Sequence, residues 1–127
     1  MKKLLYIFLI LLVGCANEPA QIITEQNADQ TINTSVGKEL SIQLNGNATT
    51  GYAWNFSSDS PTAYQIIQDE YVENKHAEGM VGVGGLHIYH IKTLQAGQFT
   101  ITARYYRPWQ EFNPEKDKQL SFSIDVK

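Results

Sequence analysis

The chain has a single cysteine among its 127 residues, and this scarcity excludes several kinds of site. The cysteine is Cys15, close to the N-terminus, so the rest of the sequence cannot form a disulfide, a cysteine-ligated zinc site or a thiol nucleophile. The folded part must therefore hold together by its packed core alone, and about 100 residues are enough for one modest core.

Recognisable enzyme motifs are also missing. The sequence contains neither G-x-S-x-G nor H-E-x-x-H. His87 and His90 are three residues apart in an expected strand, so their side chains point to opposite faces and cannot share a metal ion. His76 lies in the preceding connection, with no cysteine or carboxylate pair to assist it. We therefore expect no catalytic residues, no metal site, no cofactor and no enzymatic activity.

Basic residues are too few for a protein that binds nucleic acid. The formal net charge of the whole chain is −3. Lys2 and Lys3 are the only charged residues among the first fourteen, so the remainder is more acidic, at −5. An acidic domain without a stripe of lysine and arginine argues against nucleic acid as a partner.

One long apolar run is present, but it is too short to span a bilayer as a stable helix. Leu4–Val13 follows two lysines, which is typical of a signal peptide, whereas a spanning helix needs about 20 apolar residues. The segment "LVGC" resembles a bacterial lipobox, which predicts cleavage before Cys15 and lipidation of its thiol. An ordinary secretory signal, or a short uncleaved anchor with an incidental cysteine, are the alternatives.

These features divide the chain into three predicted parts. Residues 1–14 are expected to be a lipoprotein signal peptide, 15–29 the lipidated cysteine and a polar tether, and 30–127 a folded domain. Ile22 and Ile23 could instead begin an edge strand, which leaves the end of the tether open. The expected location is extracytoplasmic, with a lipid anchor in a membrane of the cell envelope.

From residue 31 onward, apolar and polar residues alternate with a period of two, which is typical of half-buried β-strands. No helical period extends beyond one turn. The pattern therefore predicts an all-β fold, an immunoglobulin-like antiparallel β-sandwich of about seven strands. The strongest segments are 40–45, 52–57, 99–106 and 120–127, and the weaker ones are 31–35, 64–72 and 86–94.

Three unusual connections are expected at one end of this sandwich. If successive strands are antiparallel, "GNATTG", "HAEGMVGVGG" and "RPWQEFNPEKDKQ" all emerge together, as the binding loops of immunoglobulin domains do. Each also has a plain structural interpretation. Asn47 and Gly51 could supply positive φ angles in a turn capped by the threonines, and the glycines could form a flexible hairpin connection. Trp109 could be an exposed binding anchor or could fold back over the core.

Together the three connections resemble the chagasin family of cysteine-protease inhibitors. The family pattern N-P-T-T-G-[YF]-x-W corresponds to "NATTGYAW", the pattern G-x-G-G to "GVGG", and R-P-W to "RPW". Their order and spacing fit, and the similarity extends from about Val36 to the C-terminus. Ala48 stands where the family has a proline.

The resemblance implies a reversible, competitive inhibitor of papain-like cysteine proteases that wedges three loops into the active-site cleft. The first loop would cover the catalytic Cys–His pair, the glycine-rich loop would follow the non-primed side, and Trp109 would lie on aromatic residues of the primed side. The expected partners are such a protease and, through the lipid anchor, a membrane, and the protein is expected to be a monomer. The implied protease-binding residues are Asn47, Thr49, Thr50, Gly51, Tyr52, Gly82, Gly84, Gly85, Arg107, Pro108 and Trp109.

Two other functions remain open from the residues alone. An adhesion or carbohydrate-binding envelope lipoprotein would use Trp109 with Tyr105 or Tyr106 as an aromatic stacking platform. A structural envelope module would have no soluble target, and it would tolerate replacement of all three loops.

Overall fold

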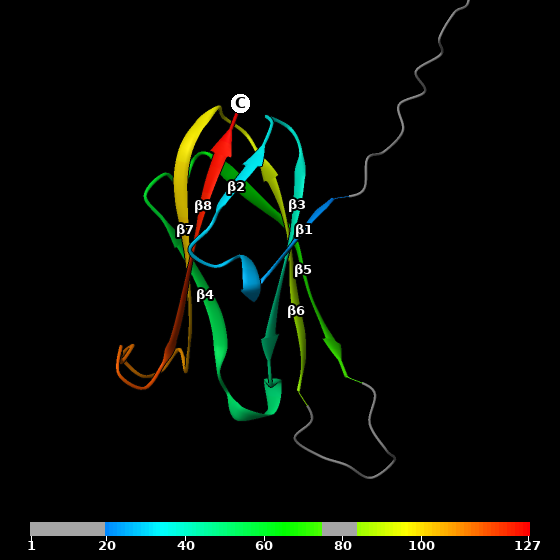
Figure 1. Ribbon diagram of the computed structural model, residues 1–127. Coiled ribbons are helices and arrows are strands. Elements are labelled where there is room, and N and C mark those ends of the chain that lie inside the picture. Colours follow the sequence, from blue (N-terminus) through cyan, green and yellow to red (C-terminus); the bar gives the residue numbers. More distant parts are fainter. Residues whose placement is uncertain (1–19, 75–83) are drawn as a thin grey trace, which may run out of the picture.

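The computed structural model describes residues 20–74 and 84–127, which form a sandwich of two four-stranded sheets (Figure 1). Two short 3-10 helices, η1 (Glu25–Asn27) and η2 (Ala48–Thr50), interrupt the strands. Within these two ranges no helix is long and apolar enough to cross a membrane. The strands are β1 (Gln21–Thr24), β2 (Thr31–Thr34), β3 (Glu39–Gly46), β4 (Ala53–Ser58), β5 (Tyr64–Glu73), β6 (Gly85–Thr93), β7 (Gly97–Tyr106) and β8 (Lys118–Val126).

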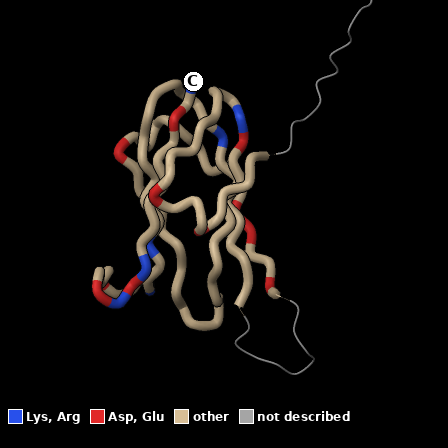
Figure 2. The backbone as a smooth tube through the Cα atoms, viewed as in Figure 1, with Lys and Arg blue, Asp and Glu red and all other residues tan. Residues whose placement is uncertain are grey.

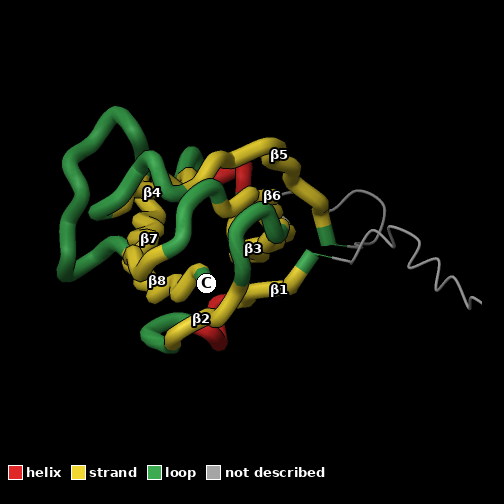
Figure 3. Tube along the Cα trace, turned by 90° about the horizontal axis from the view of Figure 1, so that it is seen from above, coloured by secondary structure: helices red, strands yellow, loops and turns green. Residues whose placement is uncertain are grey.

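The sheets have the strand orders β1-β3-β6-β5 and β2-β8-β7-β4, and Figure 3 shows them as two facing layers. Neighbouring strands are antiparallel except at two edges, where β1 runs parallel to β3 and β2 runs parallel to β8. The chain crosses between the sheets after β1 and again after β2, so each of these strands joins a sheet beside a strand that is not its chain neighbour. The predicted immunoglobulin-like β-sandwich is confirmed, with eight strands where about seven were expected.

The additional strand is β1, which lies in the segment expected to be a tether. It pairs with β3 from Gln21↔Leu40 to Thr24↔Gln43, and Ile23 is only 1% exposed. The structure therefore shows an edge strand at Ile22 and Ile23, the alternative to a tether that the sequence left open. Residues 21–29 lie within the sandwich. Such a short strand has a single core residue, so its alternation was invisible in the sequence. The predicted signal peptide and Cys15 lie outside the described residues.

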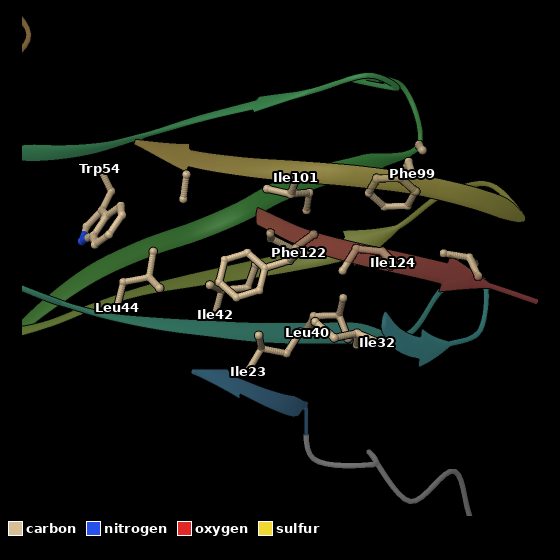
Figure 4. Close-up of a cluster of buried hydrophobic side chains, with 14 residues drawn as sticks. Ile23, Ile32, Leu40, Ile42, Leu44, Trp54, Phe99, Ile101, Phe122 and Ile124 are labelled. Carbon is tan, nitrogen blue, oxygen red and sulfur yellow. The ribbon is translucent and has the colours of Figure 1, made fainter. Parts of the chain in front are cut away.

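The core lies between the two sheets and consists of inward-facing apolar side chains (Figure 4). In β3, for example, Leu40, Ile42 and Leu44 have no exposed surface, because residues two apart share one face of a strand. Burying each such side chain contributes about 1.5–3 kcal/mol. The cluster comprises Ile23, Ile32, Leu40, Ile42, Leu44, Trp54, Ala63, Ile91, Phe99, Ile101, Ala103, Phe122, Ile124 and Val126.

The β3–β4 and β7–β8 loops emerge at the same end of the sandwich, opposite the C-terminus (Figure 1). The β5–β6 connection includes residues 75–83, which lie outside the described part of the chain. Its two flanks are joined by a 3.0 Å hydrogen bond from the backbone N–H of Asn74 to the carbonyl oxygen of Gly84. Gly85, the first residue of β6, pairs with Gly46, so this connection ends beside the β3–β4 loop.

Candidate functional site

The β3–β4 loop is a compact turn held by its own polar side chains. Asn47 caps η2, and its Oδ1 accepts hydrogen bonds from the backbone N–H of Thr49 (3.0 Å) and from the Thr49 hydroxyl (2.6 Å). The Thr50 hydroxyl donates to the Asn47 carbonyl oxygen (2.8 Å) and accepts from the backbone N–H of Tyr52 (3.3 Å). The two exposed threonines therefore fix the shape of the loop, as short polar side chains do in turns.

Gly51 ends this turn in the left-handed region, at φ 79° and ψ −7°, where a residue with a Cβ is disfavoured. The plain interpretation of the loop as a turn also expected a positive φ at Asn47, and that expectation is wrong. Asn47 is extended, at φ −135° and ψ 104°, because a residue that caps a helix N-terminus adopts the β region.

The β7–β8 loop begins with a turn that projects Trp109. The backbone N–H of Gln110 donates to the Arg107 carbonyl oxygen (2.9 Å), which places Pro108 at the second position of a four-residue turn, where proline is favoured. Trp109 is 70% exposed, so it does not fold back to cover the core. Its ring lies over Gly51, because a Cβ built on Gly51 would be only 2.5 Å from the indole Cη2.

Arg107 ties the two loops together. Its Nε donates a 3.1 Å hydrogen bond to the carbonyl oxygen of Thr50, and its guanidinium carbon lies 4.8 Å from the centre of the Tyr52 ring. Such a position over an aromatic face is attractive for a cation. The Thr-Thr-Gly-Tyr and Arg-Pro-Trp segments are therefore one contiguous unit in space.

The described glycines of the β5–β6 connection pack closely against neighbouring backbone. A Cβ on Gly84 would lie 3.4 Å from the Gly46 carbonyl oxygen, and one on Gly85 would collide with the Val72 carbonyl oxygen and the Tyr71 ring. Gly85 is buried, so it is a packing position at the root of the connection. Gly82, also predicted to bind the protease, lies outside the described residues.

The sequence did not predict that the hydroxyls of two tyrosines contact the backbone of the β3–β4 loop. The hydroxyl of Tyr105 accepts from the backbone N–H of Asn47 at 2.8 Å, and that of Tyr71 is 3.5 Å from the backbone N–H of Ala48. Tyr105 continues the inward-facing phase of Ile101 and Ala103, which was the available signal. Tyr71 gave no signal, because its relation to the loop depends on which strands are neighbours.

The aromatic platform of the carbohydrate-binding alternative is not assembled in this structure. Tyr105 faces inward and lies between Trp54, at 4.8 Å between ring centres, and Tyr52, at 5.3 Å. Tyr106 is on the opposite face of β7, where its hydroxyl accepts from Nδ2 of Asn55 at 3.0 Å. Neither tyrosine therefore forms a shared flat surface with Trp109.

The two described histidines occupy different environments. His87 faces inward between Tyr71 and Tyr89, with ring centres 4.9 and 5.9 Å away. Its Nδ1 is buried and has no hydrogen-bond partner within the described part of the chain. Burial lowers the pKa of His87 below its ordinary 6.5, and the nearby Asp69 carboxylate opposes that shift. His90 lies on the outer face, its Nε2 3.8 Å from a Glu70 carboxylate oxygen. In residues 20–74 and 84–127, no three His, Cys, Asp or Glu side chains could hold a metal ion together.

The β3–β4 loop has no charged side chain of its own. No Lys, Arg, Asp or Glu occurs between Glu39 and Asp59, a segment that includes the whole β3–β4 loop. Figure 2 shows this uncharged loop between the mixed charges of the β7–β8 loop and the acidic residues of β5. The side chains of this loop can therefore enter a cleft without the free-energy cost of removing an ion of their own from water.

Comparison with known proteins gives a consistent result. The chain is similar to Amoebiasin-2 of Entamoeba histolytica, with 32% identity over 122 residues, 96% of this chain and 98% of the relative. It is also similar to Chagasin of Trypanosoma cruzi, with 32% identity over 111 residues, 83% of this chain and 94% of the relative. The crystal structure of a cysteine protease inhibitor from Entamoeba histolytica superposes with a TM-score of 0.73 and 30% identity, covering 85% and 96% of the two chains.

The family assignment rests on most of the folded region. The sequence profile of the Chagasin family peptidase inhibitor I42 matches residues 33–126, which run from β2 to the end of β8 and include all three loops. The chain therefore belongs to the chagasin family of peptidase inhibitors.

Proposed function

We propose that this protein is a reversible, competitive inhibitor of papain-like cysteine proteases, and that its loop end enters their active-site cleft. The observation that carries the proposal is the joined unit of two loops, in which Trp109 lies over Gly51 and Arg107 bonds to Thr50. In this arrangement Thr49, Thr50 and Gly51 cover the catalytic Cys–His pair. The glycine-rich connection follows the non-primed side, and Trp109 lies on the primed side.

The conformation of the β3–β4 loop explains why the protease would not cleave it. A papain-like enzyme attacks a substrate carbonyl with an activated thiolate. Here the Asn47 carbonyl oxygen accepts two hydrogen bonds, from the N–H (3.2 Å) and the hydroxyl (2.8 Å) of Thr50. The Thr50 carbonyl oxygen accepts one from Arg107. The Asn47 carbonyl precedes the η2 turn and the Thr50 carbonyl ends it, and both oxygens are already paired inside the loop, so neither can enter the oxyanion hole of the enzyme without breaking these bonds.

The binding energy benefits from loops that are already ordered. Each internal hydrogen bond of the β3–β4 loop removes conformational freedom before the protease arrives, so less entropy is lost on association. Protease–inhibitor interfaces of standard size, about 1,600 Å², can be very tight for this reason. One copy carries all three loops, so the monomer is sufficient for inhibition.

The decisive experiment is a titration of residues 16–127 against papain, with a serine protease as control. We expect papain activity to fall, to recover on dilution, and to require more inhibitor as the substrate concentration rises. Unchanged papain activity at micromolar inhibitor, or equal loss of the serine protease, would contradict the proposal.

We also infer that residues 1–14 are a signal peptide and that Cys15 is lipidated, which places the protein outside the cytoplasm on a membrane. The lipobox-like "LVGC" and the absence of any second cysteine support this inference. The direction of β1 is compatible with it. Gln21 pairs with Leu40 at the start of β3, whereas the inhibitory loop follows Gly46 at the other end of that strand.

A further inference from the structure

The β3–β4 loop rests on side chains from both sheets. The backbone N–H of Asn47 donates a 2.8 Å hydrogen bond to the hydroxyl of Tyr105, on β7. The next N–H, of Ala48, lies 3.5 Å from the hydroxyl of Tyr71, on β5 of the other sheet. Hydrogen bonds weaken steeply as they lengthen, so the contact with Tyr105 is the stronger of the two.

The Tyr105 ring has little freedom to move. It is stacked on Trp54, its cross-strand partner, and Tyr52 lies on it at 5.3 Å between ring centres. Trp54 is itself only 7% exposed, and its Nε1 donates to the Asn45 carbonyl oxygen at 3.1 Å. The hydroxyl of Tyr105 is therefore held by a stack of rings that begins in the core.

The two ends of η2 are fixed by different residues. Tyr105 holds the N–H of Asn47, which precedes the helix, and Arg107 holds the carbonyl oxygen of Thr50, its last residue. If the first attachment is lost, η2 can tilt about the second. Such a tilt would change how far Thr49 projects from the end of the loop.

We propose that Tyr105 is a positioning residue for protease binding, and that its hydroxyl determines how far η2 projects beyond the ends of the strands. This role rests on the inhibitory function proposed above. The half-buried ring lies behind the loop, between Trp54 and Tyr52, so Tyr105 acts through Asn47 rather than by touching the protease.

The test removes the hydroxyl and keeps the ring. In Tyr105→Phe the stack on Trp54 remains, and the acceptor for the Asn47 N–H is lost. We expect the inhibition constant for papain to rise about five-fold or more, mainly through faster dissociation. Amide hydrogen exchange at Asn47 and Thr49 should quicken by a similar factor in the free inhibitor.

Two matched controls separate positioning from stability. Tyr106→Phe makes the same chemical change one residue along β7, where the hydroxyl accepts from Asn55 on the outer face. Phe122 is fully buried between the sheets, so Phe122→Leu should lower the free energy of unfolding. This substitution leaves the Tyr105 hydroxyl in place. Both variants should inhibit papain within two-fold of the parent protein.

The outcomes are distinct. Full inhibition by Tyr105→Phe with unchanged exchange at Asn47 would overturn the positioning role while leaving the inhibitory function intact. Equal weakening by Phe122→Leu would also overturn it, because reduced stability would then be the cause. If the parent protein itself fails to inhibit papain, the proposed function fails and this role fails with it. Weakening confined to Tyr105→Phe, together with faster exchange, would establish the role.

Discussion

Single residues at the loop end connect motifs that are far apart in the sequence. Gly51 has a φ of 79° and lies directly under the indole of Trp109, and a residue with a Cβ satisfies neither requirement. A glycine of one motif therefore makes room for the tryptophan of another. This contact explains physically why Thr-Thr-Gly and Arg-Pro-Trp occur together in one chain.

Trp109 is expected to be an energetic anchor for binding. Its large exposed ring becomes buried when a protease covers the loop end, and truncation of such anchors typically weakens binding by about 2 kcal/mol or more. Trp109→Ala should therefore raise the papain inhibition constant about thirty-fold. The thermal midpoint should change little, because the ring is 70% exposed in the free protein.

Val36→Ala serves as the control for Trp109→Ala. Val36 is an exposed apolar residue whose backbone N–H bonds to the carbonyl oxygen of Lys127, at the opposite end of the molecule. Its truncation should leave inhibition unchanged. A collapse of the thermal midpoint in Trp109→Ala would instead assign that residue to the core.

Ala48 is where this chain departs from its family, and the structure favours a proline at this position. Ala48 is the first residue of η2, a preferred position for proline, and the extended Asn47 before it is compatible with one. Among residues 20–74 and 84–127, the proline would cost the Ala48 N–H its 3.5 Å contact with the Tyr71 hydroxyl. Restricting the unfolded chain in this way is worth about 0.4–1 kcal/mol.

Ala48→Pro should therefore stabilise the protein and tighten papain inhibition by about two- to five-fold. Ala48→Gly, which adds freedom at the same place, should shift both measurements in the opposite direction. A clearly weaker inhibitor after Ala48→Pro would show that the bond to Tyr71 matters, and the roles assigned to Thr49 and Thr50 would then fail.

At the scale of strands, the period-two pattern was informative where a strand places several residues in the core. The segment predicted at 40–45 is β3 (Glu39–Gly46), and that predicted at 99–106 is β7 (Gly97–Tyr106). β1 was left open because only Ile23 of its four residues enters the core. The loop motifs could also be recognised in the sequence, because each is a short run of consecutive residues. The contacts of Tyr71 and Tyr105 with the β3–β4 loop could not be predicted, because they depend on how two strands of different sheets are placed.

β1 provides a test of where the domain begins. Ile23 and Ile22 are adjacent, but Ile23 is 1% exposed and Ile22 is 61% exposed. Ile23→Ala should lower the free energy of unfolding by about 2–5 kcal/mol, as expected for a cavity in the core. Ile22→Ala should change it by less than about 0.5 kcal/mol. Urea unfolding measures both, and equal small effects would mean that β1 is not docked in solution.

At the scale of the whole molecule, β1 enters the sandwich at the end of β3 that lies away from the β3–β4 loop. β1 enters level with Leu40, and the β3–β4 loop begins after Gly46, six residues further along the same strand. At about 3.3 Å per residue, the loop lies roughly 20 Å beyond the point where the chain enters the sandwich. An anchor at Cys15 would therefore present the loops away from the membrane, toward a protease in the surrounding solution.

Cys15→Ser tests the anchor. If Cys15 carries the lipid, the serine variant should leave the membrane fraction or accumulate with its signal peptide uncut. Inhibition of papain by the purified folded domain should be unaffected, because Cys15 precedes β1, the first strand of the described residues. Retention of the variant in membranes after a high-salt wash would mean that the attachment lies elsewhere.

The contrast between the two tryptophans has an optical consequence. Trp54 is 7% exposed and Trp109 is 70% exposed, so their indoles emit from environments of very different polarity. The fluorescence of the free protein therefore has one component from a buried indole and one from a solvent-exposed indole. Burial of Trp109 in a protease cleft would shift only the component from the exposed indole to shorter wavelength. The protein thus carries its own spectroscopic reporter at its loop end, and an internal reference in its core.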